Sequence, residues 1–84
     1  MKRVDFKKIQ ITDIEGNKQE ADVSKELGNL MYMQGQNIEE CELGREIWLK
    51  GEVELEEKQI NIVKPFIQRY PYVVRSSIEA ALTV

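Results

Sequence analysis

A single cysteine and a complete lack of histidine decide how this chain of 84 residues can be held together. Cys41 has no partner for an internal disulfide, and without histidine the usual zinc sites are excluded as well. A chain this short must therefore rely on an apolar core, or on a partner, for its stability. Cys41 lies in the acidic run EECEL, where we favour a buried structural role over a nucleophilic one.

The composition is typical of a globular protein. Charged residues make up 32% of the sequence and hydrophobic residues 42%. No apolar run approaches the roughly 18 residues that a membrane-spanning helix needs. The segment MKRVDFKKIQ also lacks the continuous apolar stretch of a signal peptide. We therefore expect one small cytoplasmic domain over residues 1–84, with no membrane association.

Charge is distributed unevenly along the chain, although the net charge is only −3. Residues 1–8 are basic, residues 36–57 hold eight glutamates against two basic residues, and residues 58–84 are basic again. We favour ordinary solvated faces as the explanation. The alternative is a dipolar molecule that stacks head to tail or docks on a basic partner.

The N-terminal quarter predicts a β-hairpin. The apolar positions of RVDFKKIQIT change parity between Phe6 and Ile9, which predicts a bulge near Lys7 and Lys8 or burial on both faces. The turn-rich segment DIEGNK then leads into the alternating segment KQEADV. Because two strands alone are unstable in water, helices or another chain must cover them.

Two helices are predicted next. DVSKELGNLMYMQG has helical spacing, Gly28 permits a close contact on it, and Gly35 is placed to end it in a left-handed cap. NIEECELGREIWLKG is predicted to begin with a capping box at Asn37 and to end at Gly51. The short link between them implies an antiparallel or steeply crossed pair.

The last third of the chain predicts a short strand and further helices. EVEL is predicted to be extended, with Val53 and Leu55 inward. Whether it pairs with the hairpin as a third strand stays open. EEKQINIVKPFIQRY is helical, but Pro65 predicts a kink or two shorter helices. Pro71 opens a last helix as its first residue, unless that helix starts at a capping box on Ser76. The predicted fold class is α+β, with an N-terminal β-hairpin packed against three or four short helices.

The sequence holds no signature of catalysis or of cofactor binding. The lack of histidine removes the commonest general base. The segment DIEGNKQEAD fails the register of a calcium loop, and neither GxxxxGK[ST] nor GxGxxG occurs. The acidic runs IEECE and EVELEE are typical of helix starts and exposed faces. We expect no enzyme activity, no cofactor, no metal site and no small-molecule substrate.

The segment GNLMYMQG, residues 28–35, is apolar around much of its predicted helix. Such a helix either is packed centrally, which we favour with Met31 in the core, or is half-covered by a partner. In the second case the expected partner-binding residues are Tyr32, Met33 and Trp48, because aromatic side chains and methionine are enriched at protein interfaces. Trp48 also fits a core anchor, the role that we prefer for it.

Nucleic-acid binding is the alternative function. Two short helices joined by QGQN resemble a helix-turn-helix in outline. The second of them, IEECELGREIW, carries four glutamates, whereas affinity for DNA depends on cationic contacts. The remaining possibility is a small nucleic-acid-associated transcriptional regulator. Its basic N-terminal segment would contact the phosphate backbone of the nucleic acid through Lys2, Arg3, Lys7 and Lys8.

The run SKELGNLMYMQGQNIEECELGREIWLKGEVELEEKQINIVKPFI resembles small uncharacterised proteins encoded by bacterial phages and mobile elements. The likeness lies in the order of a hairpin, a helix with LGN, and GEVEL leading into a C-terminal helix. It covers about half of the chain and assigns no role to any residue. It implies a small accessory or assembly protein.

The leading hypothesis is therefore a non-enzymatic protein–protein interaction or assembly factor. Its partner is another protein or a second copy of the chain, bound through an apolar helix face and steered by the acidic middle of the sequence.

Overall fold

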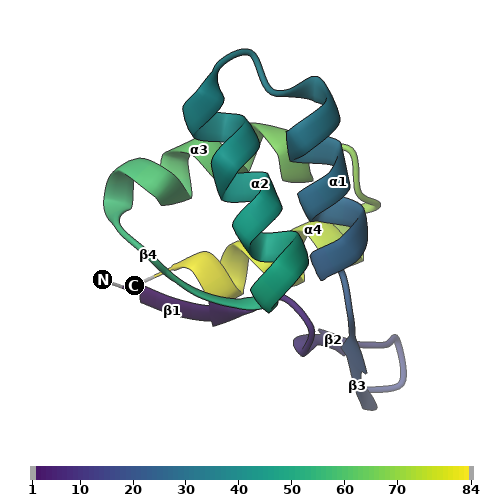
Figure 1. Ribbon diagram of the computed structural model, residues 1–84. Helices are drawn as coiled ribbons and strands as arrows, with labels where there is room; N and C mark the ends of the chain where they lie inside the picture. Colours follow the sequence, from purple (N-terminus) through teal and green to yellow (C-terminus); the bar gives the residue numbers. More distant parts are fainter. Residues whose placement is uncertain (1, 84) are drawn as a thin grey trace.

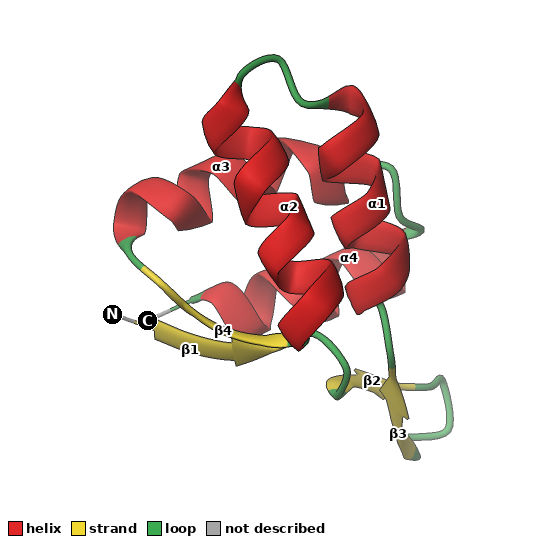
Figure 2. Ribbon diagram, in the orientation of Figure 1, coloured by secondary structure: helices red, strands yellow, loops and turns green. Residues whose placement is uncertain are grey.

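The computed structural model describes residues 2–83, which form two small sheets and a group of helices (Figures 1 and 2). The sheets are antiparallel and two-stranded: β1 pairs with β4, and β2 pairs with β3. The fold class is α+β, with N-terminal strands packed against helices, as predicted from the sequence. The elements in chain order are β1 (Lys2–Asp5), β2 (Ile9–Thr12), β3 (Lys18–Ala21), α1 (Ser24–Gln34), α2 (Ile38–Lys50), β4 (Glu52–Leu55), α3 (Glu57–Ile67) and α4 (Tyr72–Leu82).

The predicted first strand of the hairpin is divided into β1 and β2 by a turn. The Asp5 carboxylate accepts the N–H of Lys7 at 3.0 Å, and the Asp5 carbonyl accepts the N–H of Lys8 at 3.1 Å. Phe6 before the turn and Ile9 after it are both buried. A turn between the two strands therefore lets Phe6 and Ile9 both face the core, and the predicted bulge is wrong.

The backbone of Phe6 connects the two sheets. Its N–H donates to the carbonyl of Gly51 at 2.8 Å, and its carbonyl accepts the N–H of Val23 at 2.8 Å. Gly51 lies between α2 and β4, and Val23 lies between β3 and α1. One residue thus fixes the junctions of both sheets with the helix pair.

The EVEL segment is a strand, β4, but it pairs with β1 and not with the hairpin. Val53 lies opposite Val4 and Glu54 lies opposite Arg3 in the register. Val53 and Leu55 are buried, as the alternation predicted.

The predicted hairpin is confirmed as β2–β3, and it projects from the helical body (Figure 1). Its loop is closed by the N–H of Asp13, which donates to the carbonyl of Asn17 at 2.9 Å. Gly16 in this loop has a φ of 90°, a left-handed conformation that glycine adopts without steric cost. The base of the hairpin is anchored by Ile9, which is buried in the core.

α1 and α2 lie side by side and run in opposite directions, in close contact at two glycines (Figure 1). A Cβ atom on Gly28 would lie 2.6 Å from the carbonyl oxygen of Gly44. A Cβ atom on Gly44 would lie 2.6 Å from the Cβ of Met31. The helices could not approach this closely if either position carried a side chain.

The ends of α1 and α2 agree with prediction in part. At the start of α2 the Glu40 carboxylate accepts the N–H of Gln36 at 2.9 Å and not that of Asn37, so only half of the predicted capping box forms. The Asn37 side chain accepts the N–H of Glu40 at 2.9 Å, and Gly51 ends α2 with a φ of 74°. The left-handed cap predicted at Gly35 is wrong, because its φ of −63° and ψ of 138° are extended. A close contact explains this glycine instead: a Cβ there would lie 2.8 Å from the sulfur of Cys41.

The prolines act differently from prediction. α3 continues through Pro65 and ends at Ile67, so the predicted division into two helices is wrong. Pro65 lies in the last turn, so α3 ends two residues after the one hydrogen bond that the missing N–H removes. Pro71 precedes the first residue of α4 as its N-cap, and Ser76 lies inside α4 and starts no helix.

The core is one cluster of buried apolar side chains drawn from both sheets and all four helices among the described residues. Met31 belongs to it, as predicted, whereas Cys41 is only half-buried. The members are Val4, Phe6, Ile9, Val23, Leu27, Met31, Leu43, Ile47, Val53, Leu55, Ile60, Val63, Ile67, Tyr70, Ile78 and Leu82.

The glycine contact generates a first prediction. We expect Gly44→Ala to lower the free energy of unfolding by about 1–3 kcal/mol, because the added methyl group pushes α1 and α2 apart. Alanine's higher helix propensity offsets only part of this loss. Urea denaturation measures the change, and Glu42→Ala on the exposed side of α2 is the control. Equal stability of Gly44→Ala and the native chain would show that the helices separate without cost.

A second prediction concerns Tyr70, whose buried hydroxyl has no hydrogen-bond partner among the described residues. Burial, followed by the negative charge of Glu26, raises the pKa of Tyr70 to about 12. This pKa exceeds the value of about 10 in an unfolded chain, so folding favours the neutral phenol of Tyr70. The stability that this preference contributes is present below pH ~10 and is lost as the pH rises through about 12.

We expect Tyr70→Phe to unfold at the same or a higher urea concentration, since it removes an unsatisfied buried polar group. Ultraviolet absorbance titration should show the loss of the late-titrating phenol. A fall of more than about 1 kcal/mol in stability would mean that the hydroxyl has a partner, such as an ordered water.

Candidate functional site

Trp48 and Tyr32 lie on the outer side of the α1–α2 pair. Their exposed fractions are 43% and 53%, so the predicted central packing of this part of α1, and the preferred role of Trp48 as a core anchor, are wrong. Gly28 gives the physical reason: a Cβ atom there would lie 2.7 Å from the Cβ of Trp48. The glycine lets Trp48 lie against the backbone of α1 without entering the core.

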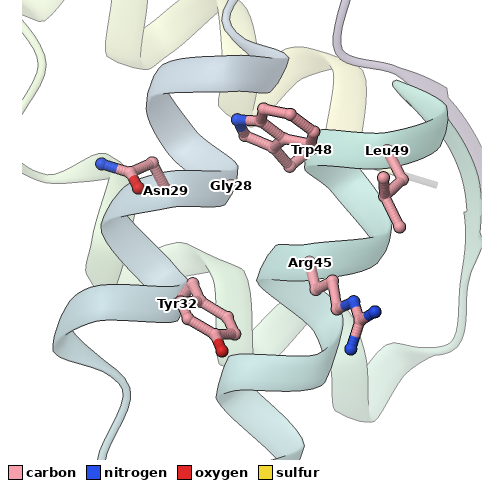
Figure 3. Close-up of a pocket in the computed structure, with 6 residues that line it drawn as sticks. All are labelled: Gly28, Asn29, Tyr32, Arg45, Trp48 and Leu49. Atoms are coloured by element: carbon pink, nitrogen blue, oxygen red, sulfur yellow. The ribbon is translucent and has the colours of Figure 1, made fainter.

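The two aromatic side chains line one shallow pocket of about 250 Å³ (Figure 3). Figure 3 shows the rings of Tyr32, from α1, and Trp48, from α2, over the crevice between the helices. We call this pocket the aromatic groove. Its lining residues are Gly28, Asn29, Tyr32, Arg45, Trp48 and Leu49.

Met33 does not line the aromatic groove, although it follows Tyr32 directly. Its side chain is 70% exposed near the end of α1. Successive residues of a helix point about 100° apart, so Tyr32 and Met33 face different directions. The structure therefore brings together two of the three predicted partner-binding residues.

Sequence reasoning missed Asn29, Arg45 and Leu49. Their helical spacing could have found them, because Asn29 lies three residues before Tyr32, and Arg45 lies three residues before Trp48. The missing information was that Gly28 and Gly44 set these two helix faces against each other.

Two cationic side chains, Lys25 and Arg45, lie at the aromatic groove. The ammonium nitrogen of Lys25 lies 3.7 Å from the centre of the Trp48 ring and donates a hydrogen bond of 2.9 Å to the Trp48 carbonyl. The guanidinium of Arg45 takes part in none of the ion pairs among residues 2–83. No carboxylate belongs to the lining within this part of the chain. The groove therefore offers aromatic surface beside cationic groups in a chain whose net charge is negative.

A larger and more polar depression, of about 610 Å³, lies between the α1–α2 link and α3. Its charged side chains are engaged with neighbours in the same chain. Lys58 forms an ion pair with Glu39 at 2.9 Å, and Arg69 donates a hydrogen bond to Gln34. These contacts occupy two of the cationic side chains that line this depression.

The basic N-terminal residues do not form one free cationic surface. The guanidinium of Arg3 donates to the carboxylate of Glu54 at 2.7 Å, and this hydrogen bond lowers the pKa of Glu54 below its usual range. The stem of Lys7 packs against the backbone where α2 ends. Lys2, Arg3 and Lys8 line one depression between β1 and α4, but Asp5 lines it as well.

Among residues 2–83, no helix is long and apolar enough to cross a membrane. The same residues hold no group of three or more acidic or cysteine side chains that could bind a metal ion.

No protein family matches this chain, and neither a curated protein nor a solved structure shows significant similarity to it. The resemblance to proteins of phages and mobile elements therefore stays a prediction.

The contact between Lys25 and Trp48 generates a third prediction. Trp48 is the only tryptophan, so the intrinsic fluorescence reports on the aromatic groove. We expect Lys25→Ala to increase the quenching of Trp48 by acrylamide and to lower the free energy of unfolding by about 0.5–1 kcal/mol, because the ring loses its covering cation. Lys18→Ala, on the hairpin, is the matched control. Unchanged quenching in Lys25→Ala would contradict the cation–π contact.

Proposed function

We propose that this chain is a non-enzymatic protein–protein interaction domain, an assembly or accessory factor that binds its partner through the aromatic groove. The observation that carries the proposal is the exposure of Trp48 and Tyr32 in one pocket beside Arg45, which forms no ion pair among residues 2–83. The proposed compartment is the cytoplasm, which the lone cysteine supports.

The residue types in the aromatic groove support this proposal. Tryptophan, tyrosine and arginine are the side chains that most often dominate the binding energy of protein interfaces. The two aromatic side chains present a large surface at a low cost in conformational entropy, and the guanidinium of Arg45 adds a directional charge. Leu49 extends the apolar surface along α2.

The packing beneath the groove supports it as well. The close contact at Gly28 and Gly44 fixes the two helix faces relative to each other. A binding surface that is already in place loses little conformational freedom when the partner docks.

The alternative, a nucleic-acid-associated regulator acting through Lys2, Arg3, Lys7 and Lys8, has less support. Arg3 is engaged by Glu54, and the coulombic influence of Glu52 reaches it as well. The exposed glutamates of α2 would also repel phosphates.

The test is capture of partners from a lysate of the source organism by the tagged chain, with and without nuclease, and identification by mass spectrometry. We expect one stoichiometric protein that survives nuclease and is lost with Tyr32→Ala and with Trp48→Ala. Tyr72→Ala, which removes an exposed tyrosine from α4, is the matched control and should retain the partner. Circular dichroism verifies that each variant is folded.

Two outcomes would contradict the proposal. A partner retained by both groove variants would mean that another surface binds it. Recovery that disappears with nuclease, and a complex that weakens steeply with salt, would favour the nucleic-acid regulator.

A further inference from the structure

The tip of the β2–β3 hairpin carries an apolar side chain with no role in the fold. Ile14 is fully exposed, although burying an isoleucine is favourable. The loop is held by other groups: the Asp13 carboxylate accepts the N–H of Glu15 and the N–H of Asn17, both at 2.9 Å. Because these bonds and Gly16 shape the turn, Ile14 is presented to solvent on a structured loop.

The neighbours of Ile14 give the tip a distinct chemistry. Asp13 and Glu15 flank it, so one branched apolar side chain projects between two carboxylates. We call Asp13, Ile14 and Glu15 the hairpin tip. Neither carboxylate takes part in an ion pair among residues 2–83. The hairpin stands away from the helical body, so the tip is free to reach another molecule (Figure 1).

The hairpin tip and the aromatic groove are complementary. The groove offers apolar walls from Tyr32, Trp48 and Leu49, with the cation of Arg45 at its lining and that of Lys25 on the Trp48 ring. The tip offers an apolar side chain between two anions. Opposite charges around an apolar contact favour correct docking and disfavour docking of like-charged surfaces.

We infer that the occupant of the aromatic groove is the hairpin tip of a second copy of this chain. This inference rests on the proposed function, since it takes the groove as the binding surface and names what enters it. Ile14 of one copy lies between Tyr32 and Trp48 of the next, and the two carboxylates of the tip face Arg45 and Lys25.

The two surfaces differ, so the contact is head to tail. The copies then form either an open chain, with a free tip at one end and a free groove at the other, or a closed ring with neither. A contact made by one loop buries little area, and small interfaces are weak. Self-association should therefore require high protein concentration and should weaken as salt screens the charges.

Sedimentation velocity over a range of concentrations tests the inference on the 84-residue chain. We expect the native chain to increase in mass with concentration. Ile14→Ser should weaken self-association about tenfold or more, since it removes the apolar side chain that is buried in the contact. Ile38→Ser is the matched control, because Ile38 is also highly exposed but lies at the start of α2, and it should associate like the native chain.

A mixing experiment distinguishes tip-to-groove contact from other arrangements. Ile14→Ser keeps the groove and loses the tip, whereas Trp48→Ala keeps the tip and loses the groove. We expect each variant alone to be monomeric and the mixture to form a one-to-one dimer that cannot grow. Tyr32→Ala replaces Trp48→Ala if the latter does not fold.

Charge reversal adds an independent readout. Glu15→Lys and Arg45→Glu should each weaken self-association, and the double variant should recover it, because the reversed charges attract again between copies. Asp13 is unsuitable for this purpose, since its carboxylate shapes the loop.

Three results would overturn the inference. A groove-to-groove dimer would survive Ile14→Ser, be lost in Trp48→Ala, and give no mixed dimer of the two variants. A native chain that stays monomeric while a groove-dependent foreign partner is captured from lysate would leave the proposed function in place and remove only this inference. A chain that neither self-associates nor captures a groove-dependent partner would remove both.

Discussion

The close contact between α1 and α2 at Gly28 and Gly44 is the constraint on which the rest of the structure depends. With no side chains between them, the two backbones approach until the Cβ of Met31 nearly fills the space over Gly44. α1 must then divide its apolar residues between two environments. Met31 enters the core, while Tyr32 is left on the outer side, opposite Trp48. The same pair of glycines therefore stabilises the fold and creates an aromatic surface that the fold does not use.

Local sequence signals were sufficient wherever the deciding interaction is local. The hairpin loop, the cap at Asn37 and the glycine end of α2 at Gly51 were all predicted, because each depends on residues within a few positions. The division of the first strand was not. Its cause is the pairing of β1 with β4 and the bond from Phe6 to Gly51, and both partners lie far away in the sequence. The left-handed cap at Gly35 was mispredicted for a related reason. A glycine is needed there because Cys41 lies too close for a side chain, and not because the helix ends in a left-handed cap.

The candidate site was predictable in part. Residue type alone singled out Tyr32, Met33 and Trp48, and two of these share the aromatic groove. Met33 was separated from Tyr32 only by knowledge of which face of α1 meets α2. Arg45 was passed over because it lies in a strongly acidic stretch, and the structure shows that it forms no ion pair among residues 2–83.

The position of Phe6 gives the molecule a mechanical property. Its peptide groups are bonded on one side to Gly51 and on the other to Val23, and its ring is buried in the core. Tension applied to the hairpin reaches α1 along the chain from β3 and reaches Phe6 along the chain from β2, and the bond between Phe6 and Val23 links the two paths. A pull on the hairpin would strain the backbone hydrogen bonds of Phe6 and the burial of its ring at the same time. We therefore expect the hairpin to unfold together with the helical body and not one strand at a time.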